Sequence, residues 1–178
     1  MVASEWFKRE ERDAQAWENI RRQVLKRDNA TCVYCGFRAN KFMAVNHIGA
    51  EDNHDLENLE TTCKPCHAVL HIGINAMKGY LTVISSSVNQ VDIVNMTRRL
   101  VWQNTPWKRI EEIILERFLT PGGTIYDQQE SVRWANKILA SIPKDEHRGY
   151  LPDGLAVVFH EEGPWKQFSE AVHKWGKS

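Results

Sequence analysis

The sequence predicts an α+β protein, in which a small cysteine-rich unit of a β-hairpin and a helix is followed by a mainly helical α+β region. Three observations predict this class. All four cysteines of the 178-residue chain lie between positions 32 and 66. The segment between them reads as two short strands joined by a polar turn. The rest of the chain repeatedly shows apolar side chains at helical spacing.

Length and composition set the limits for function. The length suits one domain, or a small domain with a second region packed on it. The chain has 23 basic and 23 acidic residues and a formal net charge of zero. This balance excludes a strongly basic histone-like binder and an acidic tail protein, but not a local basic patch. No apolar run approaches the ~18 residues of a membrane span, and the first ten residues lack a secretory apolar stretch. We therefore expect a cytoplasmic protein.

The cysteines form two matched pairs, Cys32-x-x-Cys35 and Cys63-x-x-Cys66. Thiols in a chain without an export signal stay reduced, and two such pairs supply the four thiolates of a closed tetrahedral zinc site. Two disulfides or a redox pair are the alternatives, and the matched spacing favours zinc over both. Iron could occupy the same four thiolates. The predicted role of the metal is structural.

The elements of the zinc-binding unit follow from apolar periodicity and turn residues. A helix with an apolar and a basic face is expected first, and the first cysteine pair follows it. A strand, a polar turn and a returning arm then form the hairpin, and the second pair opens a short helix. The expected ranges are 14–28 for the first helix, 42–48 for the strand, 49–55 for the turn and 56–62 for the returning arm.

The second half reads as two strands and several amphipathic helices. Thr105-Pro106 is a helix-start signal, a capping hydroxyl followed by proline at the first helical position. The expected strands are 80–84 and 155–159, the expected helices are 90–103, 106–120, 132–142 and 164–175, and a charged loop is expected at 143–149. We divide the chain into an N-terminal segment 1–13, a zinc-binding domain 14–75 and a C-terminal region 76–178. No catalytic motif is evident in the C-terminal region, which suits docking of a protein partner.

Polar residues with catalytic potential lie inside the zinc-binding unit. His67 and His71 are four residues apart, so on a helix they share one face and can approach one metal ion. His47 ends the first expected strand and is expected to face that helix. A neutral imidazole with a pKa near 6.5 is suited to taking a proton from water, and a hard metal ion would stabilise charge on a phosphate. These are the ingredients of phosphodiester hydrolysis.

Residues 17–72 resemble an HNH endonuclease domain of the zinc-knuckle type. The matching runs are Trp17, Val24-Leu-Lys-Arg-Asp28, Cys32-Val-Tyr-Cys-Gly36, Val45-Asn-His-Ile48, Glu57-Asn-Leu59 and Cys63-Lys-Pro-Cys-His67. The resemblance implies the ββα-metal fold and hydrolysis of DNA. It implies that His47 is the general base and that Asn58 orders the loop that carries the base. It also implies that His67 binds a catalytic Mg²⁺ or Mn²⁺, with His71 as a second ligand.

One position departs from the family pattern. Asn46 precedes the general base, where the family usually has a metal-binding aspartate, and a neutral amide binds Mg²⁺ without the charge that helps displace its water. The runs Cys35-Gly-Phe-Arg-Ala39, Val45-Asn46 and Asn58-Leu59 also resemble the IcmJ (DotN) family. Those proteins are zinc-binding, HNH-derived components of type IV secretion coupling complexes. This second resemblance implies a non-catalytic adaptor, whereas the retained histidines favour a nuclease.

A basic segment precedes and includes the first cysteine pair. Between positions 21 and 41 the chain has six basic side chains and one acidic one, Asp28. Such a patch neutralises phosphates and positions double-stranded DNA without reading its bases. A solvated helix face is the alternative, and the acidic stretch 51–60 could pair with these charges internally. The candidate DNA contacts are Arg21, Arg22, Lys26, Arg27, Arg38 and Lys41.

Overall fold

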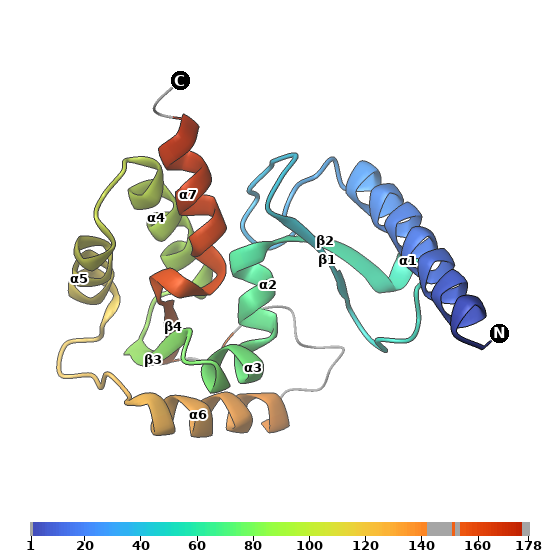
Figure 1. Ribbon diagram of the computed structural model, residues 1–178. Helices are drawn as coiled ribbons and strands as arrows, with labels where there is room; N and C mark the ends of the chain where they lie inside the picture. The colour runs from blue at the N-terminus through green and yellow to red at the C-terminus, as the bar shows by residue number, and fades with distance from the viewer. Residues whose placement is uncertain (1, 142–150, 152–153, 176–178) are drawn as a thin grey trace.

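The computed structural model of the chain describes residues 2–141, 151 and 154–175. It has the predicted α+β class, with helices and two separate two-stranded sheets. Figure 1 shows the N-terminal helix and the first hairpin on one side and the C-terminal helices on the other, with two short helices between them. The charged loop expected at 143–149 lies outside the described residues. Within the described part of the chain, no helix is both long and apolar enough to cross a membrane.

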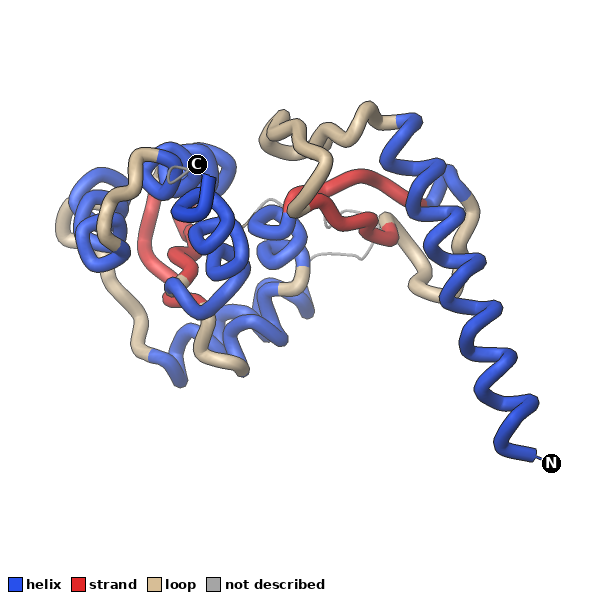
Figure 2. Tube along the Cα trace, turned by 45° about the horizontal axis from the view of Figure 1, so that its top comes forward, coloured by secondary structure: helices blue, strands red, loops and turns tan. Residues whose placement is uncertain are grey.

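The first helix, α1, spans Val2–Arg27. It begins at Val2 rather than at residue 14, so the helix is longer at its start than the apolar spacing predicted. Figure 2 shows this first part of α1 extending beyond the hairpin. The last part of α1 contacts the hairpin, where Val24 is fully buried with Val45 and Leu59 in a small core of their own. The apolar residues at helical spacing therefore lie in the part of α1 that packs against the hairpin.

The hairpin consists of β1, Met43–His47, and β2, Leu59–Cys63. The strands are antiparallel, with Met43 opposite Cys63 and His47 opposite Leu59. The arm expected as strand 56–62 begins instead with a short 3₁₀ turn, η1, at Leu56–Asn58. Because this turn reverses the chain before the ladder starts, only the second part of the predicted arm is extended.

Two short helices follow the hairpin. The helix α2 spans Lys64–Leu70 and α3 spans Ile72–Met77. Cys63 caps α2, and a proline follows within its first turn, where the missing N–H is no loss. His71 separates the two helices, with φ −102° and ψ 40°. Its backbone N–H still donates to the carbonyl of His67 at 3.1 Å, so the two imidazoles keep the expected one-turn relationship.

The C-terminal region is built on the second sheet. Its strands β3, Leu81–Ser86, and β4, Gly154–Phe159, are antiparallel and far apart in sequence. Asn89 caps the first of the helices, and its Oδ1 accepts from the N–H of Val91 at 2.8 Å. The helices of the region are α4, Gln90–Trp102, α5, Trp107–Phe118, α6, Gln128–Ser141, and α7, Lys166–Trp175, and a turn segment, η3, Glu161–Trp165, precedes α7.

Two helix starts differ from expectation. Pro106, with φ −57° and ψ 139°, is itself the residue before α5, and no side-chain hydrogen bond caps the helix. The capping role expected for Thr105 is therefore wrong, because the extended conformation of Pro106 delays the helix by one residue. The helix α6 begins at Gln128 rather than at residue 132. Its first turn is polar and carries no apolar periodicity, so the sequence pattern misses it.

A single main core joins the four-cysteine unit to the C-terminal region. Cys32, Cys63 and Cys66 belong to the same buried cluster as the strands β3 and β4 and the inner faces of α4 to α7. Trp165, only 2% exposed, lies in this cluster beside the buried Phe168. The region after residue 76 therefore packs directly on the cysteine unit.

Candidate functional site: a four-cysteine metal centre and a histidine-lined pocket

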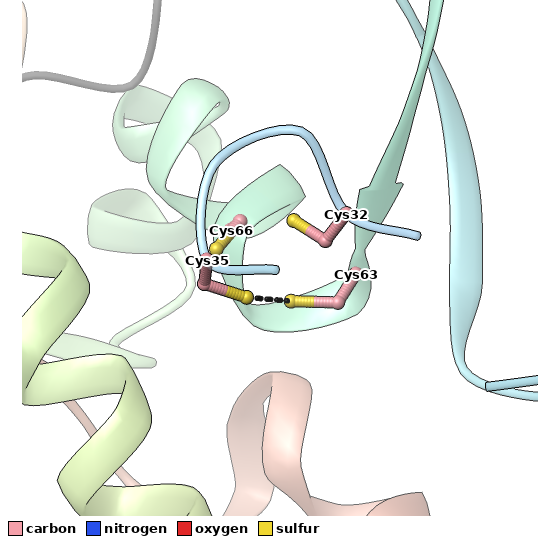
Figure 3. A group of neighbouring side chains, drawn as sticks. All are labelled: Cys32, Cys35, Cys63 and Cys66. Atoms are coloured by element: carbon pink, nitrogen blue, oxygen red, sulfur yellow. Dashed lines mark hydrogen bonds between the residues drawn. The ribbon is translucent and has the colours of Figure 1, made fainter. Parts of the chain in front are cut away.

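The four cysteines converge as the sequence predicts. Their sulfur atoms all lie within 4.8 Å of one another, and Figure 3 shows the four side chains pointing toward a common centre. The sulfurs of Cys35 and Cys63 are 3.6 Å apart, well beyond the ~2.05 Å of a disulfide. Zn–S bonds of ~2.3 Å in a tetrahedron place sulfurs ~3.8 Å apart. The cluster therefore has the donor set and the spacing of a tetrathiolate zinc site.

Local backbone structure brings the first pair into position. The N–H of Gly36 donates to the carbonyl of Cys32 at 3.0 Å, and the N–H of Cys32 donates to the carbonyl of Phe37 at 2.8 Å. Gly36 has φ +69°, a left-handed conformation that glycine adopts without steric cost. The second pair needs no such loop, because Cys63 ends β2 and Cys66 lies in the first turn of α2.

The four thiols lie so close together that hydrogen bonds among them shift the pKa of each one. Hydrogen bonds from Cys32, Cys63 and Cys66 lower the pKa of Cys35 far below its usual range. Hydrogen bonds within the same group, led by those with Cys32, raise the pKa values of Cys63 and Cys66. The hydrogen bond with Cys35 raises the pKa of Cys32, but those with Cys63 and Cys66 outweigh it and lower that pKa to about 7. Without a cation, the cluster therefore does not keep all four thiols ionised together. A divalent metal removes this conflict, because it stabilises all four thiolates together.

An arginine from the C-terminal region reaches the cysteine cluster. Nη2 of Arg98, on α4, donates to the sulfurs of Cys35 at 3.2 Å and Cys63 at 3.4 Å. Its guanidinium lies 4.2 Å from the ring centre of Phe37 and 6.0 Å from that of Trp165. A tetrathiolate zinc centre has a net charge of about −2, and this cation would partly neutralise such a centre. The sequence offered no signal for Arg98, which lies outside the motif.

The histidines expected at the catalytic site line one pocket. A cavity of about 530 Å³ lies between the end of β1 with the loop that follows it and the last part of α2, and one wall of it comes from α6. Four of the five candidate residues line it, namely Asn46, His47, His67 and His71. The structure thus brings together side chains from two parts of the motif, as the proposed catalytic role requires.

His47 is held among aromatic rings at the end of β1. Its ring stacks on Trp17 of α1 at 5.5 Å between centres, with the planes only 14° apart. Its Nε2 lies 2.9 Å from Nδ1 of His54, a hydrogen-bond distance. Burial first, and then the positive charge that His54 can carry, lower the pKa of His47 below its ordinary 6.5, against the opposing effect of Glu51. His47 is therefore neutral near pH 7.

Asn58 closes the loop between the two strands. Its Oδ1 accepts from the N–H of Gly49 at 2.8 Å, and its Nδ2 donates to the carbonyls of Ala50 at 2.9 Å and Asn53 at 2.7 Å. A Cβ on Gly49 would lie 3.0 Å from this Oδ1, so the close approach favours glycine there. Asn58 does not line the pocket. It contacts the loop that begins directly after His47.

His67 and His71 lie side by side in the pocket, with ring centres 4.5 Å apart. Burial, reinforced by the neighbouring His71, lowers the pKa of His67 to about 4. A neutral imidazole has a nitrogen lone pair available, so His67 is ready to bind a metal at neutral pH. Among the described residues, however, the cysteines are the one group of three or more histidine, cysteine or acidic side chains spaced for a metal. The pocket therefore offers two imidazoles and an amide, with Glu51 as a nearby carboxylate.

Asn46 is held by a neighbour across the hairpin. It pairs directly with Glu60 in the β1–β2 ladder, and its Nδ2 donates to Oε1 of Glu60 at 3.0 Å and to the carbonyl of His47 at 3.0 Å. The same carboxylate oxygen accepts from the hydroxyl of Tyr34 at 2.6 Å. An amide is thus the residue type that suits this environment, because a carboxylate here would face Glu60.

The basic residues expected to contact DNA have different local environments. Arg27 pairs with Asp28 and donates to the carbonyls of Leu56 at 2.6 Å and Leu59 at 2.7 Å, so it fastens the hairpin to α1. Burial alone would raise the pKa of Asp28, but hydrogen bonds from Arg27 and Thr61 outweigh it and lower that pKa. The exposed members of the set are Arg22, Lys26, Arg27, Arg38 and Lys41.

Sequence reasoning misses several residues of the pocket and its surroundings. His54 lies in the expected polar turn and is given no role there. A histidine only seven residues from the expected general base could have suggested the contact that the structure shows between the two rings. Sequence reasoning names Trp17 only as part of the family resemblance and does not predict its stacking on His47. Leu139 contributes the wall from α6, and nothing in the sequence connects it with the motif.

The comparisons with known proteins agree with this geometry. The cysteine cluster, the hairpin and the helix α2 form a ββα-metal unit of the zinc-knuckle class. Residues 32–71 match the family model described as HNH endonuclease, so the resemblance predicted from the sequence is confirmed for this segment. A search of the curated proteins found no match to the chain. The resemblance to IcmJ proteins stays a prediction.

Proposed function

We propose that this protein is an HNH-type endonuclease that hydrolyses DNA phosphodiester bonds with a divalent metal and a histidine general base. The observation that carries the proposal is the pocket of about 530 Å³ shared by His47, His67 and His71. The family match covers the segment that contains all three residues, which supports the same conclusion.

In this proposal His47 takes the proton from water. When its Nε2 donates to Nδ1 of His54, the lone pair resides on Nδ1 of His47, and that atom is the base. Stacking on Trp17 fixes the plane of the ring, and the hydrogen bond fixes its rotation. A lowered pKa keeps the base unprotonated at neutral pH. Asn58 orders the loop that follows His47.

In this proposal His67 and His71 hold the catalytic metal, with Asn46 contributing its amide oxygen. When bound, a divalent cation supplies charge stabilisation for the phosphate. Imidazole ligands suit later transition metals such as Ni²⁺, whereas Mg²⁺ and Mn²⁺ prefer carboxylates, carbonyls and water. Glu51 also lines the pocket, and its carboxylate is the available oxygen ligand that would extend the range of metals this site can bind.

An adaptor function is the second candidate, and one observation favours it. The side-chain amide of Asn46 donates hydrogen bonds to Glu60 and to the carbonyl of His47. These hydrogen bonds stabilise the hairpin, and they do not require a metal-binding carboxylate at this position. A zinc-stabilised adaptor would bind a protein through the region after residue 76 and would cleave no DNA.

Plasmid DNA separates the two functions. Zinc-loaded wild type is incubated with Mg²⁺, Mn²⁺ or Ni²⁺, beside His47→Ala and the control His160→Gln, whose histidine lies outside the pocket. We expect cleavage by wild type and by the control, and a loss of ~10²–10⁴ in rate for His47→Ala, as is typical for removal of a general base. Absence of cleavage by the zinc-loaded wild type with every metal would contradict the nuclease proposal.

A further inference from the structure

A second pocket lies on the other side of the first cysteine pair. Its volume is about 300 Å³, and it lies between the loop after Cys35 and the helices α4 and α7. Aromatic rings form its walls. The ring of Phe168 meets those of Phe37 at 6.0 Å, Phe42 at 5.3 Å and Trp102 at 6.1 Å. Trp102 is 57% exposed, which is unusual for so large an apolar side chain.

The rim of this pocket is basic. Arg38 and Lys41 both line it and are exposed, and no acidic residue is among its described lining residues. Arg21 reaches the same edge from α1, because its Nη2 donates to the carbonyl of Met43, the residue after Phe42. Three of the cations expected to contact DNA therefore lie at or beside this pocket rather than around the histidines.

Flat aromatic walls combined with a cationic rim match one ligand chemistry. An unpaired nucleobase has a π-face for stacking and is attached to a phosphate that the cations can neutralise. A base inside a duplex is stacked on its neighbours and cannot enter such a pocket unless it leaves the helix. A purely apolar ligand would not require the basic rim.

We propose that this pocket binds an unpaired base of the DNA strand that the histidine-lined pocket cuts. The inference rests on the proposed nuclease function for its choice of DNA and for the position of the cut. Phe42 directly precedes β1, and His47 ends it, so the two sites are separated by the length of this strand. Five residues at ~3.3 Å each span ~16 Å, or about five nucleotides at ~3.4 Å per base step. The substrate class is therefore DNA with a bulge, flap or mismatch some five nucleotides from the cut.

Binding of short labelled duplexes tests this inference. Fluorescence anisotropy is measured on zinc-loaded full-length protein carrying His47→Ala, so that no DNA is cut. The duplexes are fully paired or contain a single unpaired base. We expect the bulged duplex to bind more tightly, and Trp102→Leu to weaken its binding roughly 5- to 100-fold, the range for loss of one base–aromatic stack. Trp102→Phe retains a π-face and should keep most of the affinity, and Ile125→Ala is the control for an exposed apolar side chain elsewhere.

The outcomes separate this inference from the nuclease proposal. Equal binding of the bulged duplex by the His47→Ala protein with and without Trp102→Leu would overturn the base pocket, whether or not wild type cleaves plasmid. Self-association that Trp102→Leu abolishes, without an effect on DNA, would also overturn it and assign the face to a second copy of the chain. If Trp102-dependent binding holds while no plasmid is cut, the base pocket stands and the catalytic proposal fails. Lys41→Gln should in addition reduce the salt dependence of log K by ~0.7–0.9.

Discussion

The side-chain amide of Asn46 donates a 3.0 Å hydrogen bond to the carboxylate of Glu60, its direct partner across the hairpin. This pairing explains how an asparagine fits at the position where the pattern of HNH endonucleases usually has an aspartate. The carboxylate of Glu60 already occupies the neighbouring position, and it also accepts from Tyr34. Two adjacent carboxylates would repel each other and leave one without a donor.

Asn46→Asp should therefore destabilise the protein by about 1–3 kcal/mol, the range for a buried polar group that loses its partner. Adding Glu60→Gln should restore stability, because a glutamine can donate to the carboxylate introduced at position 46 and still accept from Tyr34. If the side chain at position 46 binds metal, the double variant should bind Mn²⁺ more tightly than wild type. Chemical denaturation and calorimetric Mn²⁺ titration measure the two effects. Equal stability of Asn46→Asp with and without Glu60→Gln would show that the two residues are not coupled.

Arg98→Met should weaken zinc retention by roughly 10- to 100-fold, the usual effect of removing a partner of a metal ligand. The cause is the loss of two hydrogen bonds to the thiolates and of the positive charge beside them. Release of zinc to a coloured chelator measures the effect. Arg99→Met, at the neighbouring exposed position, is the matched control. Wild-type release rates in Arg98→Met would mean that the arginine packs between the aromatic rings without acting on the metal centre.

His54→Phe should reduce kcat by roughly tenfold or more, with little change in KM, because a misdirected catalytic group slows the reaction without weakening binding. The phenyl ring keeps the contact with Trp17 but cannot accept from Nε2 of His47. His54→Asn retains a side-chain acceptor and should recover part of the rate. An unchanged kcat in His54→Phe would indicate that the ring contact with Trp17, rather than the hydrogen bond to His47, is what matters.

The depressed pKa of His67 predicts a fall in stability with acid. The unfolded chain takes up a proton near pH 6.5, whereas the folded chain takes it up only at about 4. The unfolded state therefore binds more protons between these values, and stability is full above pH 6.5 and is lost as pH falls toward 4. The effect is at most about 3 kcal/mol. Denaturation without added catalytic metal should show this slope in wild type and a shallower one in His67→Asn.

The sequence was sufficient to predict the four-cysteine cluster because the spacing within each cysteine pair is local. Each cysteine pair lies within one turn, and the zinc geometry then limits how the two turns meet. The hairpin and the helix α2 follow from the same local patterns, and their observed bounds differ from the expected ones by only a few residues. His47, His67 and His71 reach one pocket because they lie on those elements.

The residues that complete these sites come from distant parts of the chain. Arg98 reaches the cysteines only because α4 packs in the main core, and Leu139 reaches the pocket only through α6. The pairing of β3 with β4 joins segments that are far apart in the sequence. Contacts of this kind depend on tertiary packing and have no periodic signature in the sequence. The same holds for the hydrogen bond between His47 and His54, which depends on how the loop folds back.

The shared core of the cysteine unit and the C-terminal region limits how this protein can be divided or recombined. Cys32, Cys63 and Cys66 are buried together with β3, β4 and the helices around them. A graft of residues 32–71 into another scaffold would leave that apolar surface in water, with aggregation as the expected result. Protein engineers who wish to move the histidine-lined pocket should therefore transplant α4 and the second sheet with it, or redesign the exposed face as a polar surface.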